Sequence, residues 1–221
     1  KRFTGQSTTR VSKQLQWADE ADQLQILNAI QADQSAALGR ALDIVIYHAL
    51  NPKTGAALEG FTALNAQAAQ VTSGKDELAN IDNLVEAAQD WDITGIAMSR
   101  AWAAKLRKLR TSSTGTRLYP EIPLNLQAGS LDGIPAVVSN TVKGAKGHDV
   151  TPEIMAFLGD FTTIKWRLAR PITAEIIPYG DPDNTGVDLA GSNQIAYRTE
   201  AVFSYAVLNP KAIAVLKADG R

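Results

Sequence analysis

The chain of 221 residues contains no cysteine and only two histidines, His48 and His148. The absence of cysteine excludes disulfide frameworks, thiolate nucleophiles, Fe–S clusters and cysteine-based zinc sites. A histidine-rich metal site or a Ser-His-Asp triad would have to be built around one of the two histidines. The composition therefore leaves few kinds of enzymatic site open.

The sequence also lacks an excess of charge of either sign. It has 22 Lys and Arg residues against 23 Asp and Glu residues, which gives a formal net charge of −1. Without a global basic field, the chain cannot hold nucleic acid by releasing counterions over its whole surface. The charge balance argues against a dedicated DNA-binding module.

Long apolar runs are missing as well. No segment approaches the roughly 18 uninterrupted apolar residues that a membrane-spanning helix needs, and residues 1–6 lack the apolar core of a signal peptide. The hydrophobic fraction of 45% and charged fraction of 20% are typical of a soluble globular protein. Because the chain starts at Lys1 in a polar segment with no turn or cap signal, we expect an N-terminal portion to precede it.

The apolar pattern predicts one long helix in the first quarter of the chain. Over residues 17–50, apolar residues recur at spacings of three, four and seven without any proline. Gly39 is a weak point of this helix, and Pro52 followed by Gly55 ends it. Two shorter helices are predicted over residues 76–89 and 100–109, the second with Ser99 as its N-cap.

In the second half of the chain, turn-forming residues recur between short apolar runs, as is typical of a β-rich region. From residue 111 onward, Gly, Pro, Ser and Asn separate short β-type runs. The predicted strands cover residues 92–98, 134–138, 162–168, 172–177 and 195–207. The last of these is long for a strand, so it should cross a sheet that spans much of the molecule. The predicted fold class is α+β.

Two loops carry residues of the kind found in ligand sites. Gly74-Lys75 resembles the end of a phosphate-binding loop, but Asp76 stands where Ser or Thr should follow. Residues 181–186 start like a calcium loop, but Ser192 stands where a bidentate Glu would close it. Solvated surface loops explain both segments better.

Neither histidine has neighbours that favour catalysis. His48 lies near the end of the long helix, where a cation would complement the helix dipole. His148 precedes Asp149 in a loop, and a lone His-Asp step has little specificity as a proton-transfer pair. The sequence predicts no catalytic, cofactor-binding or metal-binding residue.

One predicted helix has a cationic face. We interpret this face as a solvated surface or as an ion-pair surface between subunits. It consists of Arg100, Lys105, Arg107, Lys108 and Arg110.

The second half of the chain carries a series of short motifs. Their order and spacing are a more specific signal of a protein family than any one motif alone. It begins with Met98-Ser99, Gly115-Thr116-Arg117-Leu118-Tyr119, Leu131-Asp132-Gly133-Ile134-Pro135-Ala136-Val137 and Leu158-Gly159-Asp160-Phe161. It continues through residues 167–177 and 181–184 to Tyr197-Arg198-Thr199-Glu200 and Asn209-Pro210-Lys211-Ala212-Ile213. Over nearly its whole length the chain resembles the major capsid proteins of tailed bacteriophages, with the Hong Kong 97-type (HK97) fold.

The resemblance implies a subunit with two domains. Residues 1–61 and 194–221 are expected to form a peripheral domain. Within it, residues 1–16 would be the end of an extended loop that lies over a neighbouring subunit, and about residues 17–50 the spine helix. Residues 62–193 are expected to form an axial domain that points to the hexamer or pentamer axis.

The resemblance further implies a structural protein and not an enzyme. Its copies would self-assemble as hexamers and pentamers into the icosahedral shell of a phage or prophage, enclosing double-stranded DNA without sequence-specific binding, cofactor or membrane. The expected partners are further copies, a scaffolding segment or protein, a maturation protease and a portal. The expected location is the virion capsid, with assembly in the bacterial cytoplasm.

Several charged residues are candidates for contacts between subunits. They are Lys1, Arg2, Arg10, Lys143, Lys146, Arg198 and Glu200. Arg198 and Glu200 stand two apart on a predicted strand and so share one face. Cross-linking through a Lys–Asn isopeptide bond, known in some relatives, is left open because no convincing residue trio is found.

Two other functions compete with the capsid interpretation. An encapsulin-type nanocompartment would share the fold and package a cargo protein instead of a genome. A small hydrolase or metal-dependent enzyme would use His148 with Asp149.

Overall fold

The computed structural model describes residues 1–22, 25–122 and 129–219. Its contacts divide the chain into two compact units. Unit 1 contains Lys1–Leu42 and Trp166–Tyr205, and unit 2 contains Asp43–Lys165 and Ala206–Arg221. The expected boundaries lie at residues 61/62 and 193/194. The contacts instead group residues 43–61 and 206–221 with unit 2, and residues 166–193, which include most of β9 (Ile164–Ile177), with unit 1.

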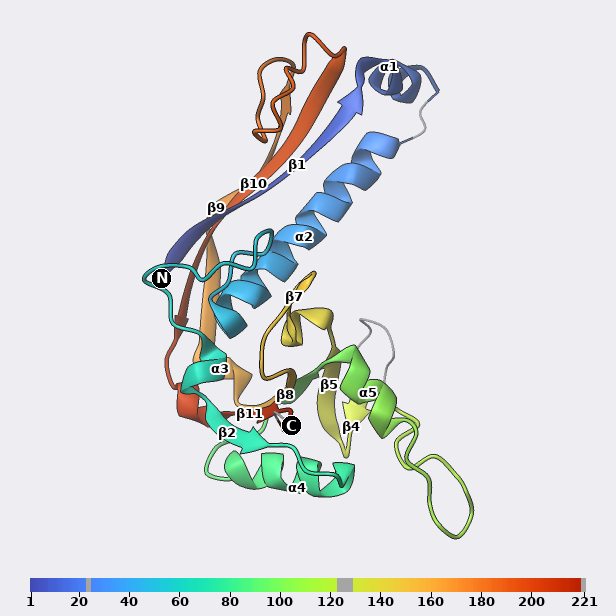
Figure 1. Cartoon of the computed structure of the whole chain (residues 1–221), viewed down its shortest axis with the longest axis vertical. Helices are drawn as coiled ribbons and strands as arrows, with labels where there is room; N and C mark the ends of the chain where they lie inside the picture. Colours follow the sequence, from blue (N-terminus) through green and yellow to red (C-terminus); the bar gives the residue numbers. More distant parts are fainter. Residues whose placement is uncertain (23–24, 123–128, 220–221) are drawn as a thin grey trace. The chain divides into compact units, whose positions relative to one another are not determined.

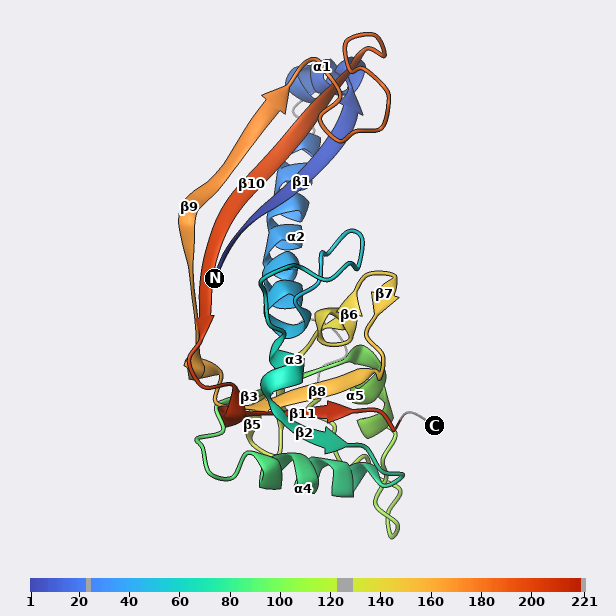
Figure 2. The ribbon, with the colours of Figure 1, turned by 60° about the vertical axis from the view of Figure 1, so that its left-hand side comes forward.

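Unit 1 is built on a three-stranded sheet with the order β1-β10-β9. The strands are β1 (Arg2–Ser12), β9 (Ile164–Ile177) and β10 (Gln194–Val207), and they run side by side in Figures 1 and 2. β1 and β10 pair antiparallel from Arg2 opposite Ser204 to Ser12 opposite Gln194. Most of residues 1–16, expected to end an extended loop, thus form a strand that pairs within the chain.

The N-terminal helical region is divided into two helices. The sequence predicted one helix over residues 17–50, whereas α1 spans Lys13–Asp22 and α2 spans Ile26–His48. The break has a local cause, because the Asp19 carboxylate accepts the Ile26 backbone N–H at 2.7 Å and Gln25 has a φ of 57°. Gly39, the expected weak point, continues the helix.

A buried amide joins α2 to the sheet of unit 1. The Gln34 side chain donates to Thr9 Oγ1 and to the Tyr197 carbonyl, both at 2.9 Å. Its carbonyl oxygen accepts from Thr199 Oγ1 at 2.6 Å. Burial of this polar group is therefore compensated by three hydrogen bonds, which also fix the helix against β1 and β10.

Unit 2 is built on a six-stranded mixed sheet with the order β2-β11-β8-β3-β5-β4. In chain order the strands are Ala69–Thr72, Gly95–Met98, Gly129–Leu131, Ile134–Val138, Ile154–Gly159 and Ile213–Lys217. Every residue of β8 is buried, as its central place in the sheet requires. A separate hairpin joins β6 (Gly144–Ala145) to β7 (His148–Asp149).

Helices and short turns complete unit 2. The helices are α3 (Leu64–Gln67), α4 (Glu77–Ala87) and α5 (Arg100–Leu106). Three 3₁₀ turns cover Asn140–Val142, Phe161–Thr163 and Pro210–Ala212. The predicted Ser99 cap of α5 is confirmed by a hydrogen bond from the Trp102 backbone N–H to Ser99 Oγ at 3.3 Å.

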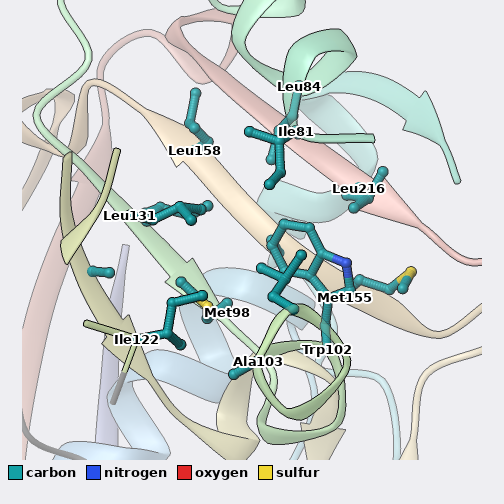
Figure 3. Packing of buried hydrophobic residues seen from close by; sticks show 14 of the residues in the cluster. Ile81, Leu84, Met98, Trp102, Ala103, Ile122, Leu131, Met155, Leu158 and Leu216 are labelled. Atoms are coloured by element: carbon teal, nitrogen blue, oxygen red, sulfur yellow. The ribbon is translucent and has the colours of Figure 1, made fainter. Parts of the chain in front are cut away.

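The largest core lies between the sheet of unit 2 and the helices α4 and α5. In Figure 3, Trp102 extends from α5 toward Ile81 of α4. Its indole N–H also donates to Glu77 Oε2 at 2.8 Å, so one side chain contributes apolar packing and a polar link between the helices. The other face of the sheet carries a second core that includes Phe157, stacked on Tyr47 with ring centroids 4.6 Å apart.

One strand prediction was wrong. The two strands expected over residues 162–168 and 172–177 form the single strand β9, which runs through Pro171. Proline is tolerated there because β9 is the edge of its sheet, where a missing N–H need not interrupt a ladder. No helix in the described part of the chain is both long and apolar enough to cross a membrane.

Candidate interaction surfaces

Arg10 holds the loop between β9 and β10 against the sheet of unit 1. Its guanidinium forms ion pairs with Asp181 and Asp183 and donates to the Val187 carbonyl at 2.8 Å. Arg198 adds a hydrogen bond to the Pro182 carbonyl at 2.7 Å. The arginine fixes the shape of this long loop by binding it at three points.

The same contacts decide between the two interpretations of residues 181–186. Asp181 accepts backbone N–H groups from Thr185 at 3.0 Å and Gly186 at 2.6 Å, as in a tight turn. These bonds, together with the Arg10 charge, lower the pKa of Asp181. The carboxylates that suggested a calcium loop therefore bind an arginine and their own backbone, which favours the surface turn.

Arg198 and Glu200 lie on one face of β10, as their spacing predicted. Glu200 accepts from Gln6 Nε2 at 2.9 Å, and Arg198 Nε donates to Thr8 Oγ1 at 3.4 Å. Gln6 and Thr8 are their direct partners on β1. Both charged side chains are half-buried, so this face of the sheet presents them only in part to any neighbour.

The segment with Lys143 and Lys146 is a tight hairpin. Lys143 Nζ forms an ion pair with Asp149 at 2.6 Å, whereas Lys146 lies exposed at the turn. Gly144 has a φ of 140°, and a Cβ there would lie 2.5 Å from the His148 carbonyl oxygen. Asp149 is thus engaged with a lysine and not with His148, which weakens the proton-transfer hypothesis.

His48 belongs to a buried polar cluster in unit 2. Its Nδ1 accepts from the Asn65 side-chain amide at 3.0 Å, and its Nε2 donates to the Thr141 carbonyl at 2.9 Å. This pairing assigns the neutral tautomer, and burial lowers the pKa of His48. The expectation of a cation at the helix end was wrong, because the ring is 5% exposed and its two nitrogens are matched to one donor and one acceptor.

Asp43 adjoins this cluster through Thr141. Its carboxylate accepts from Thr141 Oγ1 at 3.3 Å. Burial raises the pKa of Asp43 to about 6. Asp43 and His48 therefore both favour their uncharged forms, for the same reason.

The remaining candidates are exposed. Lys1 and Arg2 lie at the start of the edge strand β1. Arg100 and Lys105 on α5, and Lys108 just after it, face solvent. Arg107 is half-buried and donates to the Pro120 carbonyl at 3.1 Å. The predicted cationic face is thus present, with Arg107 turned inward.

The phosphate-loop resemblance and metal binding find little support in the geometry. The Gly74 backbone N–H donates to Asn80 Oδ1 at 2.6 Å, so this amide is engaged within the chain. Among the described residues, no group of three or more His, Asp or Glu side chains could hold a metal ion.

β9 presents several exposed large apolar side chains, which the sequence reasoning missed. Nearly all its residues are exposed, although it is 14 residues long. Side chains of alternate residues form one apolar face, with Trp166, Leu168, Ile172 and Ile176 exposed by 57, 40, 42 and 51%. A long apolar edge strand of this kind is typical of a surface that another chain covers.

Comparison with known proteins gives a consistent result. The sequence profile of the Phage capsid family matches residues 4–218. A search of curated proteins gave no match.

Solved structures agree over almost the whole chain. A chain from Mycobacterium phage Ogopogo is 31% identical with a TM-score of 0.83, and the match covers 99% of this chain and 76% of that one. A chain from Gordonia phage Cozz is 28% identical with a TM-score of 0.76, covering 100% of this chain and 71% of that one. A chain from the capsid of an empty GTA particle is 13% identical with a TM-score of 0.61, and the match covers 97% of this chain and 71% of that one. The two chains share the fold.

Proposed function

Because this chain belongs to the phage capsid family and is a structural, non-enzymatic subunit of a capsid shell, we propose that its copies form hexamers and pentamers that enclose double-stranded DNA in an icosahedral shell. The observation that carries the proposal is the family match over residues 4–218. The fold is the HK97-like fold of phage capsids, as the resemblance implied. The nanocompartment alternative is not favoured, and neither is the hydrolase built on His148.

The enclosed DNA would be held without sequence-specific contacts. A formal net charge of −1 provides no uniform basic surface for tight binding of phosphates. A closed shell confines its contents by geometry, so a neutral subunit suits this task.

We propose the peripheral and axial assignment for the two parts of the chain. Residues 1–61 and 194–221 would be peripheral, and residues 62–193 axial. The division into two compact units, one with a long sheet and most of α2, supports a two-part subunit, but the units group residues 43–61 and 206–221 with the axial part and residues 166–193 with the peripheral part. The edge strand β1 would lie close to a neighbouring subunit.

The proposed partners are further copies of the chain, a scaffolding segment or protein, a maturation protease and a portal. The subunit is located in the virion capsid, and we propose that it assembles in the bacterial cytoplasm.

Among the seven candidate contact residues, the structure supports some more than others. Lys1, Arg2 and Lys146 are exposed and available to a neighbour. Arg198 and Glu200 are half-buried on one sheet face. Arg10 and Lys143 form ion pairs with aspartates of the same chain, so we propose a structural role for them in preference to a contact between subunits.

The test is electron microscopy of the recombinant full-length protein, with and without a scaffold, after sizing by light scattering. Closed polyhedral shells, or hexamer and pentamer rings, are the expected result. Nuclease-protected double-stranded DNA in shells from infected cells would support the genome-packaging part. Protein that stays monomeric under all these conditions would contradict the proposal.

A further inference from the structure

Charge is strongly segregated in one stretch of unit 2. Residues 76–92 contain six acidic and no basic residues, and residues 93–120 contain six basic and no acidic residues. The acidic segment includes α4, and the basic segment includes α5 and the loop that follows it. The near-zero net charge thus hides two oppositely charged surfaces on one unit.

The basic segment ends in a closed loop, residues 110–117, which we call the arginine loop. Arg110 pairs with Arg117 across its neck, and the Thr111 N–H donates to the Thr116 carbonyl at 2.9 Å. Gly115, with a φ of 67°, closes the turn. In Figures 1 and 2 the loop extends away from α5, and residues 112–118 are all exposed.

The cations of the arginine loop have no acidic partner in the described part of the chain. Arg110 donates to the carbonyls of Arg107 and Leu109 at 2.8 and 3.1 Å, near the end of α5. Arg117 forms no ion pair with any described residue. Next to Arg117, Leu118 is 39% exposed, so the loop presents positive charge beside an apolar side chain.

The acidic segment borders a groove of about 300 Å³ between α4 and the β4–β5 hairpin. We call it the acidic groove. Its carboxylates are Asp82, Glu86 and Asp132, and Val85 and Ile134 are among its apolar lining residues. All three carboxylates are exposed, and none forms an ion pair with another described residue.

Two observations show that the acidic groove carries uncompensated negative charge. Asp82 and Glu86 stand at i and i+4 on α4, where like charges destabilise a helix. The pKa of Tyr119 is raised to about 12, chiefly by burial, and further by the charge of Asp132, by the hydrogen bond between Tyr119 and Asp132, and by the charges of Asp82 and Glu121. A cationic and partly apolar segment would relieve this repulsion and cover the apolar lining at once.

We propose that the arginine loop of one subunit docks in the acidic groove of a second copy of the chain. The inference rests on the role of the chain as a shell subunit, which supplies neighbouring copies. The positive charge of the arginine loop complements the negative charge of the acidic groove, and both have apolar side chains beside their charges. The loop and the groove are distinct patches of one unit. A contact between two different patches runs head to tail, and it closes into a ring when the rotation between copies permits.

Disulfide trapping tests the proximity directly, because residues 1–221 contain no cysteine. Glu86→Cys combined with Arg117→Cys in the full-length protein should form, on oxidation of assembled shells, a ladder of covalent oligomers under denaturing, non-reducing conditions. Each single variant serves as the control and should stay largely monomeric. A double variant that stays monomeric, with or without an internal disulfide, would overturn the proposal.

Charge reversal tests the energetics. Asp82→Lys with Glu86→Lys, and separately Arg110→Glu with Arg117→Glu, should each lower the yield of shells at least about tenfold, since like charges would face each other. Combining all four changes should recover the yield to within about threefold of the natural chain. The matched controls are Asp90→Lys with Asp92→Lys and Lys53→Glu with Lys75→Glu. They change exposed residues of unit 2 outside the loop, the groove and the cationic face, and they should change the yield less than about twofold.

The outcomes separate this proposal from the shell function. Circular dichroism and thermal melting of the unassembled variants identify any set that fails to fold, and the cysteine pair then decides. Full yields from both reversed sets, or no recovery when folded sets are combined, would refute the docking and leave the shell function intact. Failure of the natural chain to form shells would instead count against both.

Discussion

Replacing His48 tests the buried polar cluster of unit 2. His48→Ala leaves the Asn65 amide and the Thr141 carbonyl without their partner. Each buried polar group left unpaired costs about 1–3 kcal/mol, so the free energy of unfolding should fall by about 2–6 kcal/mol. His148, the only other histidine, is exposed, and His148→Ala should cost about 0.5 kcal/mol or less.

The pH dependence of stability follows from the same cluster. Burial lowers the pKa of His48 below its ordinary 6.5, so below about pH 6.5 the unfolded chain binds a proton that the folded chain excludes. Stability should therefore fall on acidification, by at most about 1.4 kcal/mol per pH unit. Asp43 acts in the opposite direction, because its pKa rises from 3.8 to about 6 and the folded chain binds the proton more tightly. Its contribution is present at low pH and is lost as the pH rises through about 6.

These opposing signs make the variants diagnostic. In Asp43→Asn the acid-induced loss of stability should become steeper between about pH 6 and pH 4, because only the histidine contribution is left. In His48→Ala the stability should instead rise over this range. Urea unfolding of the unassembled protein at fixed concentration, followed by tryptophan fluorescence, measures both slopes. Equal slopes in the natural chain and His48→Ala would refute the neutral, buried imidazole.

Three further substitutions test the packing. Gly39→Ala should raise the free energy of unfolding by about 0.5–1 kcal/mol, because Gly39 is an exposed helical residue and a Cβ there meets nothing within 4 Å. A lower melting temperature would contradict this prediction. Arg10→Met should speed hydrogen exchange in the loop of residues 178–193, measured by mass spectrometry, because it removes the ion pairs to that loop. Arg2→Met on the same strand should not change the exchange rate. Equal exchange rates in the two variants would show that the ion pairs do not hold the loop. Leu84→Ala should lower the free energy of unfolding in urea by about 2–5 kcal/mol, since Leu84 is fully buried. Leu78→Ala should lower it less, since Leu78 is 40% exposed. Equal losses would contradict the assigned core.

Local signals were sufficient for much of the fold. The strand over residues 134–138, the helix predicted from about residue 76, the helix capped by Ser99 and the long strand over residues 195–207 are all found close to where the sequence predicted them. These features depend on contacts within a few residues of one another. The α+β class and the HK97-like fold were also predictable, the latter from the order of motifs along the chain.

The failures have other physical origins. The break between α1 and α2 depends on a single carboxylate, Asp19, that reaches seven residues ahead to Ile26. The ion pairs of Arg10 join residues more than 170 positions apart, so no local pattern could reveal them. β9 was divided in two because proline is a strand breaker except at an edge, and edge position is a property of the sheet. For Arg10 and β9, tertiary structure decided what the local sequence left open.

Composition was a poor guide to the surface for a related reason. A net charge of −1 suggested a neutral subunit, and this was correct as a sum. The sum does not show that six acidic residues precede six basic residues along one stretch of unit 2. The acidic residues lie on α4 and beside it, and the basic residues lie on α5 and in the segment that follows it. For an isolated protein, leaving such charges unpaired has a cost without a benefit. For a subunit surrounded by copies of itself, the same arrangement stabilises a directed contact while the total charge of the shell stays low.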